Sequence, residues 1–209
     1  MELSVTFDEA ILVIKSFWQE PTLPFVGNDI SEAKRIATEW NTTLPTELNT
    51  YLLSYAPNPA FYFANVGNST SLYSPPNIQK LALGYNFNPL TNQNIAGWND
   101  NWILIGDEGA DPIIIDLSAV SENGQCAVFK AGHGCGEWDF SPIADSLSQF
   151  ILLQSALHHA LVGFDIEDSI IDDQSGFNLA PQPASWLFPL VKKYAGSYYD
   201  DWVNIFDNA

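Results

Sequence analysis

Residues 102–117 have the sequence WILIGDEGADPIIIDL, which decides the fold. Two apolar runs, Trp102–Ile105 and Ile113–Ile115, flank the turn-rich stretch Gly106–Pro112. Short apolar runs bounded by Gly, Asp and Pro predict two strands joined by a tight loop. Pro112 lacks a backbone donor and therefore suits the start of the second strand. The stretch predicts a hairpin at the centre of a sheet.

Three carboxylates, those of Asp107, Glu108 and Asp111, are expected at one rim of this hairpin. Clustered carboxylates can bind hard cations, but the spacing lacks the twelve-residue calcium loop with its bidentate Glu. A single motif of this kind is weak evidence for catalysis. We expect Asp111 to cap the turn through its own side chain, with Glu108 facing solvent. Neither catalytic residues nor a metal site is predicted here.

Composition bounds the class of protein. A chain of 209 residues can bury a substantial core, and 46% hydrophobic residues with seven Trp exclude wholesale disorder. No apolar stretch approaches the roughly 18 residues of a membrane span. The N-terminus lacks the basic region of a signal peptide, and two cysteines are too few for a disulfide framework. These features predict a soluble cytoplasmic protein without a membrane partner.

Acidic residues dominate the charge balance. Twenty-five Asp and Glu against seven Lys and Arg give a net charge of −18. Such a surface repels phosphate backbones, which argues against nucleic-acid binding. It favours and steers a basic partner, although acidity can also serve solubility alone. Neither Lys nor Arg occurs between Lys130 and Lys192, where eight acids stand: Glu137, Asp139, Asp145, Asp165, Glu167, Asp168, Asp172 and Asp173.

Apolar periodicity and capping signals place the remaining elements. The expected helices are Thr6–Gln19, from Asp29 or Ser31 to Trp40, Leu44–Tyr55, from Ser141 to Leu161, Ala184–Tyr194 and Tyr198–Phe206. The expected strands outside the central hairpin are Phe61–Phe63, Ser71–Tyr73, Cys126–Lys130 and Glu137–Phe140. A helical turn is expected within Pro75–Leu81, and Asn86–Asn101 reads as a loop that is either packed on the surface or part of a recognition face.

Other motifs contain residue types that occur in metal, phosphate or catalytic sites. Cys126, His133 and Cys135 lack the paired Cys spacing of structural zinc sites, and Cys126 is expected to be a small core residue. The glycine run 132–136 lacks the Lys-Ser/Thr of a phosphate loop. Neighbouring residues assemble no Ser/His/Asp triad. We therefore predict a protein without catalytic activity or a cofactor.

Trp138 lies between Glu137 and Asp139. Tryptophan is enriched among the residues that dominate binding energy at interfaces, so Trp138 could anchor a partner. In an alternating strand it would instead point into the core, with the flanking acids outside. The alternation favours the core position.

The order of motifs resembles the SUKH superfamily, which includes Smi/Knr-type cell-wall regulators and bacterial immunity proteins. The resemblance spans roughly residues 30–161. The matching residues are Leu44-Pro45, Gly106, Gly109, Asp111, Asp116-Leu117, Val128-Phe129, Asp145-Ser146-Leu147 and Phe150-Ile151. One departure is Ala110-Asp111-Pro112, where the family more often has Gly-Asp followed by an aromatic or polar residue, so the loop conformation is expected to differ.

The resemblance implies an α+β fold with a mostly antiparallel central sheet flanked by helices. We expect a SUKH-like domain over residues 1–162, with a helical, acidic and aromatic-rich C-terminal extension, residues 163–209, packed on it. The resemblance also implies a protein-binding role, commonly the neutralisation of a toxin. An acidic surface would complement a basic toxin such as a nuclease. A regulatory scaffold and a small-molecule module using the aromatic strand and the Asn-rich loop are the alternatives.

Two acidic surfaces are candidates for the binding face. The rim sits on strand ends and turns, so its side chains would lose little entropy on binding. The later acids fall in a segment of weak periodicity, where ordering would offset part of their contribution. We expect contacts at the rim and long-range steering by the later acids. The rim is formed by Asp107, Glu108, Glu137 and Asp139, with Asp111 and Trp138 as further candidate contacts, and the later acids are Asp165, Glu167, Asp168, Asp172 and Asp173.

Overall fold

A computed structural model describes residues 5–27, 30–81, 84–88, 90–132 and 137–209. Its α-helices are α1 (Phe7–Phe17), α2 (Ile30–Glu39), α3 (Thr46–Thr50), α4 (Leu147–Val162), α5 (Pro181–Tyr194) and α6 (Tyr199–Val203). A π-helical turn, η1 (Tyr51–Tyr55), continues α3, and two 3-10 turns are η2 (Pro75–Asn77) and η3 (Gly196–Tyr198).

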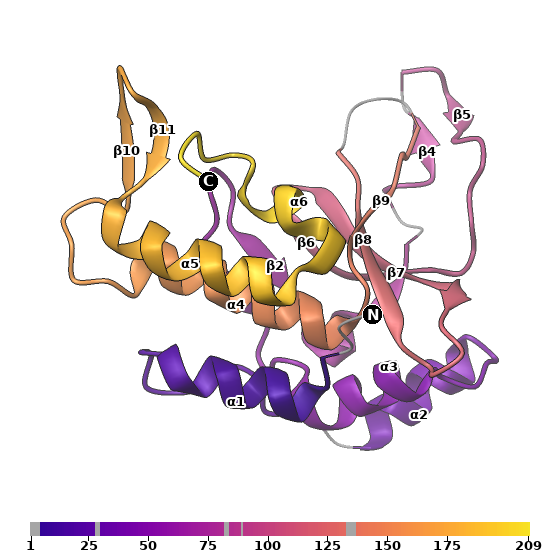
Figure 1. Cartoon of the computed structure of the whole chain (residues 1–209). Helices are drawn as coiled ribbons and strands as arrows, with labels where there is room; N and C mark the ends of the chain where they lie inside the picture. Colours follow the sequence, from indigo (N-terminus) through magenta and orange to yellow (C-terminus); the bar gives the residue numbers. More distant parts are fainter. Residues whose placement is uncertain (1–4, 28–29, 82–83, 89, 133–136) are drawn as a thin grey trace. The chain divides into compact units, whose positions relative to one another are not determined.

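The strands form one large sheet and two small hairpins (Figure 1). The sheet strands are β1 (Phe61–Phe63), β2 (Thr70–Leu72), β3 (Gln79–Lys80), β6 (Trp102–Glu108), β7 (Asp111–Val120), β8 (Cys126–Lys130) and β9 (Ser141–Ala144). Their order is β1-β2-β6-β7-β8-β9, and β3 also pairs with β6. The hairpins are β4–β5 (Phe87–Asn88 and Gln93–Asn94) and β10–β11 (Ile170–Asp173 and Gly176–Leu179). The predicted α+β class with a mostly antiparallel sheet is confirmed.

The chain divides into two compact units. The sheet unit comprises Pro24–Tyr62 and Thr70–Leu147, and the helical unit comprises Met1–Leu23, Phe63–Ser69 and Ser148–Ala209. The predicted division into a domain over residues 1–162 and an extension stays a prediction.

The central hairpin is confirmed as β6 and β7, whose apolar runs are buried on both faces of the sheet. Ile103 pairs with Ile115, and Leu104 pairs with Ile114 on the opposite face. The register shifts between Leu104 and Gly106, a bulge at which β2 comes close. A Cβ at Gly106 would collide with the carbonyl oxygen of Ser71, so this position requires glycine.

Two predictions in the segment before α4 are wrong. Residues Glu137–Phe140 form no strand, and Ser141-Pro142 do not begin a helix but lie in β9, opposite Phe129 and Lys130. Both helix starts and edge strands tolerate a proline that donates no hydrogen bond, so Ser-Pro fits either. The helix begins at Leu147.

The Asn-rich segment and the C-terminal segment also contain structure that the sequence did not predict. Residues Asn86–Asn101 include the β4–β5 hairpin, and the acidic stretch Asp165–Asp173 ends in β10, the first strand of the β10–β11 hairpin. Helix α5 begins at Pro181 because proline fits a first helical turn, where its missing donor has no partner anyway.

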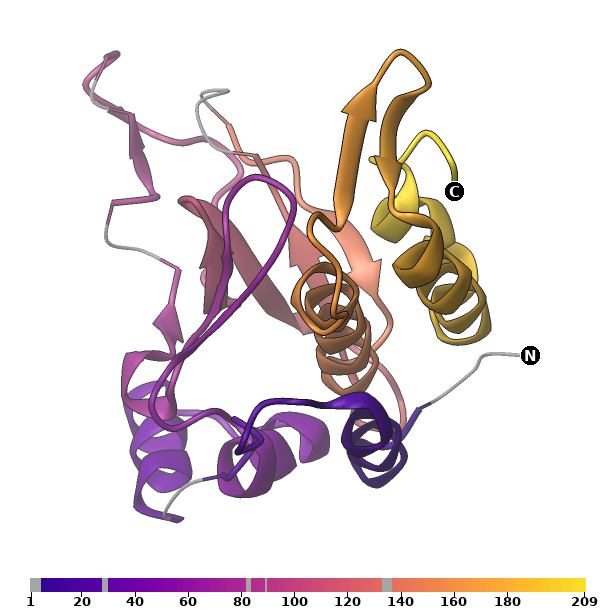
Figure 2. The ribbon, with the colours of Figure 1, turned by 90° about the vertical axis from the view of Figure 1, so that its left-hand side faces the viewer.

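In the helical unit, α1, α4 and α5 have roughly aligned axes (Figures 1 and 2). Helix α1 starts with a capping box in which Thr6 and Glu9 exchange hydrogen bonds. An aromatic cluster joins the three helices: Phe17 lies 5.0 Å from Trp186 and 5.2 Å from His159, measured between ring centroids. Gln149 also donates to the carbonyl of Tyr194 at 2.7 Å. These contacts connect elements far apart in the sequence.

Candidate partner-binding site

The rim carboxylates of the sheet unit flank a two-residue turn. Strand β6 extends to Glu108 and β7 starts at Asp111, so only Gly109 and Ala110 form the loop. Both have positive φ, 59° and 83°, as tight hairpin turns of the primed type require. Oδ1 of Asp107 accepts from the backbone N–H of Ala110 at 3.4 Å. Asp107 thus makes a hydrogen bond across the turn that Asp111 was expected to cap.

Glu108 does not face solvent as predicted. Its Oε2 lies 2.6 Å from Nζ of Lys130 on β8, and only 19% of the Glu108 side chain is exposed. The two strands on either side of β7 bring these residues together, although they are 22 positions apart. The ion pair neutralises one of the three carboxylates that flank the hairpin turn.

Asp107 is held by an aromatic hydroxyl. The Tyr73 side chain donates to Oδ2 of Asp107 at 2.5 Å. Burial, the hydrogen bond to Asp107 and the charges nearby raise the pKa of Tyr73 far above its usual value, so the hydroxyl stays protonated. Burial also raises the pKa of Tyr85, with further contributions from the charges of Asp107 and Asp111. Both tyrosines therefore lie near the rim.

Half-buried aromatic side chains cover one face of the sheet beside these acids. They pack against a buried cluster of Leu81, Leu104 and Ile114. The aromatic residues are Tyr73, Tyr85, Trp98, Trp102, Phe129 and Phe140. Aromatic surface of this kind, apolar but still accessible, is typical of protein interfaces.

Trp138 joins this face. Its indole Nε1 donates to the carbonyl of Tyr85 at 2.7 Å, and its ring lies 5.6 Å from that of Tyr85. Trp138 is half-buried, whereas Glu137 and Asp139 on either side are exposed. Glu137 and Asp139 are exposed as expected, although this segment does not form the alternating strand on which that expectation was based. We call the set Tyr73, Tyr85, Asp107, Asp111 and Trp138 the acidic–aromatic face.

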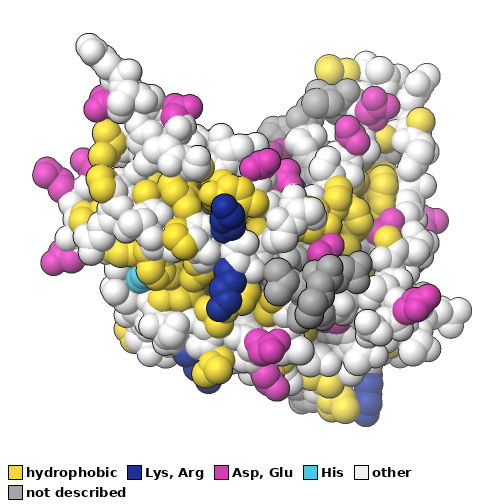
Figure 3. All heavy atoms as spheres, in the orientation of Figure 1, with side chains coloured by type: hydrophobic (Ala, Val, Ile, Leu, Met, Phe, Trp, Pro, Cys, Tyr) yellow, Lys and Arg dark blue, Asp and Glu magenta, His cyan; other side chains and the backbone are white. Residues whose placement is uncertain are grey.

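The later acids belong to the helical unit. Asp165, Glu167 and Asp168 are exposed in the segment after α4, and Asp172 and Asp173 are exposed on β10. Figure 3 shows acidic side chains over the β10–β11 hairpin. Oδ1 of Asp173 accepts from the backbone N–H and hydroxyl of Ser175, which lowers the pKa of Asp173. Asp173 thus shapes the turn of its own hairpin.

Cysteine, histidine and carboxylate side chains are the common metal ligands of proteins. Among the described residues, no group of three or more His, Cys, Asp or Glu side chains is arranged to hold a metal ion. His133 and Cys135 lie outside the described residues. Cys126 is buried, as expected of a core residue, and burial raises the pKa of its thiol to about 12. A thiol that stays protonated is a poor nucleophile and metal ligand.

Comparison with protein families gives one match, to the SMI1 / KNR4 family (SUKH-1), over residues 27–153. This chain belongs to the SMI1 / KNR4 family (SUKH-1). The resemblance inferred from the order of motifs is confirmed, and the matched region includes the whole acidic–aromatic face. Membership in SUKH-1 is consistent with two roles, that of an immunity protein and that of a cell-wall regulator.

No curated protein matches the chain. The later acids lie beyond the end of the SUKH-1 match at residue 153. Across the described ranges, no helix has both the length and the apolar character needed to cross a membrane.

The sequence did not identify Tyr73, Tyr85 or Lys130 as part of the site. Tyr73 stands 34 positions from the carboxylate it contacts. One signal was available for Lys130: it is a lone cation at the end of a predicted strand next to the acidic hairpin. Only the strand order shows that this cation faces Glu108.

Proposed function

We propose that this chain is an immunity protein that binds a toxin domain and neutralises it in the cytoplasm. Its SUKH-1 membership is consistent with this role. The proposed partner is basic, since a protein of net charge −18 attracts cationic surfaces and repels anionic ones. A nuclease domain fits this chemistry, because an enzyme that acts on phosphate backbones has basic surroundings at its active site. The proposed mode of action is binding without catalysis.

The observation that carries the proposal is the acidic–aromatic face. Asp107 is fixed by Tyr73, and Trp138 is fixed by its hydrogen bond to Tyr85. Side chains held in place before binding lose little conformational entropy when a partner arrives. Trp138 contacts Tyr85, and Tyr85 lies within electrostatic range of Asp107 and Asp111. The face thus combines an apolar anchor with charge, which suits a partner surface rich in Arg and Lys.

Glu108, the third carboxylate beside the hairpin turn, has a different proposed role. Glu108 is already paired with Lys130, so it adds little net charge to the face. The later acids Asp165 and Asp172 are exposed, and we assign them to long-range steering of the partner.

The experiment that tests the proposal is co-expression with the C-terminal domain of a toxin encoded beside this gene. Wild-type protein is expected to restore growth and to form a stable complex with the toxin domain. The variant Asp107→Asn with Asp111→Asn is expected to restore growth less well. Its control is Asp200→Asn with Asp201→Asn, which removes the same charge from exposed positions in α6. Absence of both rescue and complex rules out immunity for that pair.

A regulatory scaffold of the cell-wall type is the second candidate, since SUKH-1 membership is equally consistent with it. The two roles differ in the partner. An immunity protein is encoded next to its toxin, whereas a regulator binds resident proteins and its loss changes cell-wall synthesis. Deletion of the gene in the absence of any toxin therefore separates them: a cell-wall defect supports the scaffold, and a normal wall supports immunity.

A further inference from the structure

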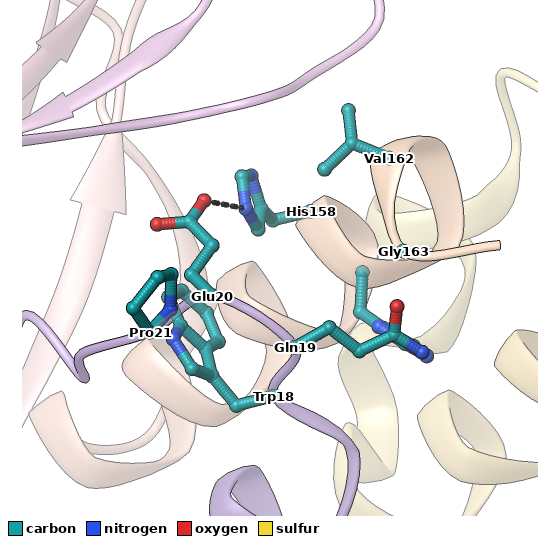
Figure 4. Close-up of a pocket in the computed structure, with 8 residues that line it drawn as sticks. Trp18, Gln19, Glu20, Pro21, His158, Val162 and Gly163 are labelled. Carbon is teal, nitrogen blue, oxygen red and sulfur yellow. Dashed lines mark hydrogen bonds and ion pairs between the residues drawn. The ribbon is translucent and has the colours of Figure 1, made fainter. Parts of the chain in front are cut away.

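The C-terminal end of α4 borders two hollows in the helical unit, and both are lined by Val162. The first has a volume of about 350 Å³ and lies between the end of α1 and α4 (Figure 4). The second, of about 620 Å³, lies between residues 64–67 and the segment from Leu161 to Ile170. Val162 is 58% exposed, so an apolar side chain at the junction of the two hollows is accessible to a partner. We call the pair of hollows the α4-end groove.

In the wall of the first hollow, His158 contacts Trp18, Glu20 and Ala64. Nδ1 of His158 accepts a hydrogen bond from the backbone N–H of Ala64 at 2.8 Å. That nitrogen therefore carries no proton, and Nε2 is the donor to Oε1 of Glu20, 3.1 Å away. The imidazole also stacks on Trp18, with ring centroids 5.3 Å apart. These contacts hold His158 in one neutral tautomer, and Figure 4 shows the carboxylate of Glu20 directed at its ring.

The second hollow combines an apolar lining with acids. Its apolar side chains are Val66, Leu161, Val162, Phe164, Ile166, Ile170 and Phe177. Glu167 and Asp168, both exposed, belong to the same lining. The volume falls within the roughly 300–1,000 Å³ of pockets that bind ligands.

The electrostatic character of the α4-end groove is negative throughout. Among the described residues that line it, Glu20, Glu167 and Asp168 are acidic and none is Lys or Arg. Burial lowers the pKa of His158 and that of His159, so both histidines are neutral near pH 7. The C-terminus of α4, a helix of 16 residues, adds the negative end of its dipole. Nothing in this lining offsets the negative potential.

We infer that the α4-end groove binds a short segment of a protein partner in which apolar side chains alternate with Lys or Arg. The apolar side chains occupy the lining around Val162, and the cations meet Glu20, Glu167 and Asp168. The inference deepens the proposed function, on which it rests for the expectation of a basic protein partner. It adds a contact surface of which only residues 64–67 fall within the family-matched region, residues 27–153.

The test uses the full chain and a short synthetic peptide of alternating Lys and Leu residues. Backbone amide NMR signals of residues 64–67 and 164–170 are expected to shift and saturate as the peptide is added. A peptide of alternating Glu and Leu tests whether positive charge is required, and a peptide of alternating Lys and Ser tests whether apolar side chains are required. Spermidine tests whether the groove simply binds small cations. None of the three is expected to saturate the groove.

Two variants sharpen the test. Glu167→Gln with Asp168→Asn is expected to weaken binding of the Lys–Leu peptide by about fivefold, as loss of two exposed charge contacts implies. The matched control, Asp200→Asn with Asp201→Asn, removes the same charge elsewhere in the helical unit and is expected to leave affinity unchanged. Val162→Ser, at an exposed helix end, tests the apolar contact without burying a polar group.

The inference is overturned if the shifts map to other residues, if the Glu–Leu peptide binds equally well, or if both double variants weaken binding alike. Saturation by spermidine would identify a small-cation site instead. Because the probe is a peptide and not a toxin, this result is independent of growth rescue. If the protein fails to restore growth but still binds the Lys–Leu peptide, the proposed function is wrong and the inference about the α4-end groove stands.

Discussion

The hydroxyl of Tyr73 donates to Oδ2 of Asp107 across 2.5 Å, which ties an aromatic side chain of the sheet face to a carboxylate of its rim. The hydrogen bond brings together two kinds of residue that matter at interfaces, and it does so before any partner binds. Asp107 also accepts from the turn N–H of Ala110, so both of its oxygens are positioned. The acidic–aromatic face therefore presents a carboxylate whose orientation is set before a partner binds.

Replacing Tyr73 by Phe removes the donor and keeps the ring. We expect the free energy of unfolding to fall by about 2 kcal/mol, because a hydrogen bond to a carboxylate contributes more than one between neutral groups. Partner binding should weaken as well, because Asp107 loses its fixed orientation. Chemical denaturation and calorimetric titration with the toxin domain measure the two effects. Loss of stability with unchanged affinity would show that Tyr73 serves the fold alone.

The ion pair of Glu108 with Lys130 predicts that Glu108 and Asp107 respond differently to neutralisation. Glu108→Gln is expected to cost less than about 1 kcal/mol of unfolding free energy, since both side chains are partly exposed. It should leave partner affinity nearly unchanged, whereas Asp107→Asn weakens it. Equal losses of affinity for the two variants would mean that Glu108 leaves Lys130 to contact the partner.

His158 predicts a pH dependence of stability. Burial lowers its pKa, despite the opposing effect of Glu20, so the folded state favours the neutral ring. Protonation would also place a proton on the nitrogen that accepts from Ala64. As pH falls below about 6.5, the unfolded chain binds the proton more readily, and stability decreases down to the lowered folded-state pKa.

Comparison of the wild type with His158→Gln isolates this contribution from that of the many carboxylates. Denaturant unfolding is measured from pH 7.5 down to pH 5. The difference in unfolding free energy between the two proteins should shrink as pH falls. A difference that stays constant with pH would show that His158 has the same pKa in both states.

The exposed acids of the helical unit predict a kinetic effect. Asp165→Lys with Asp172→Lys should lower the association rate with a basic toxin domain and leave the dissociation rate almost unchanged. Raising salt should slow wild-type association in the same way. Stopped-flow mixing at several ionic strengths provides both measurements. An association rate independent of salt would indicate that the −18 charge serves solubility alone.

Local sequence patterns were sufficient to predict the elements whose residues must be apolar because they are buried. The runs Trp102–Ile105 and Ile113–Ile115 predicted β6 and β7, because strands buried on both faces need continuous apolar residues. The Ser141-Pro142 pair was misread because an edge strand and a helix start share the same tolerance for proline. The helix predicted from Ser141 begins instead at Leu147, beyond the proline, so the position of Pro142 does not mark its start.

The candidate site was only partly predictable because its contacts are long-range. The rim acids were evident from the hairpin, but Tyr73 and Lys130 reach them through strand pairing that no local pattern encodes. The hydrogen bond between His158 and Ala64 spans 94 positions, so the groove beside it could not be inferred from either segment. Strand order and register decide such contacts.

The most direct test of the acidic–aromatic face is calorimetric titration of the purified chain with the C-terminal domain of the toxin encoded beside it. We predict that wild type and the Asp200→Asn, Asp201→Asn control bind with the same Kd. The Asp107→Asn, Asp111→Asn variant should bind at least about tenfold more weakly, and Trp138→Ala about thirtyfold, the effect expected of an interface anchor. Unchanged affinity in both face variants would contradict the account.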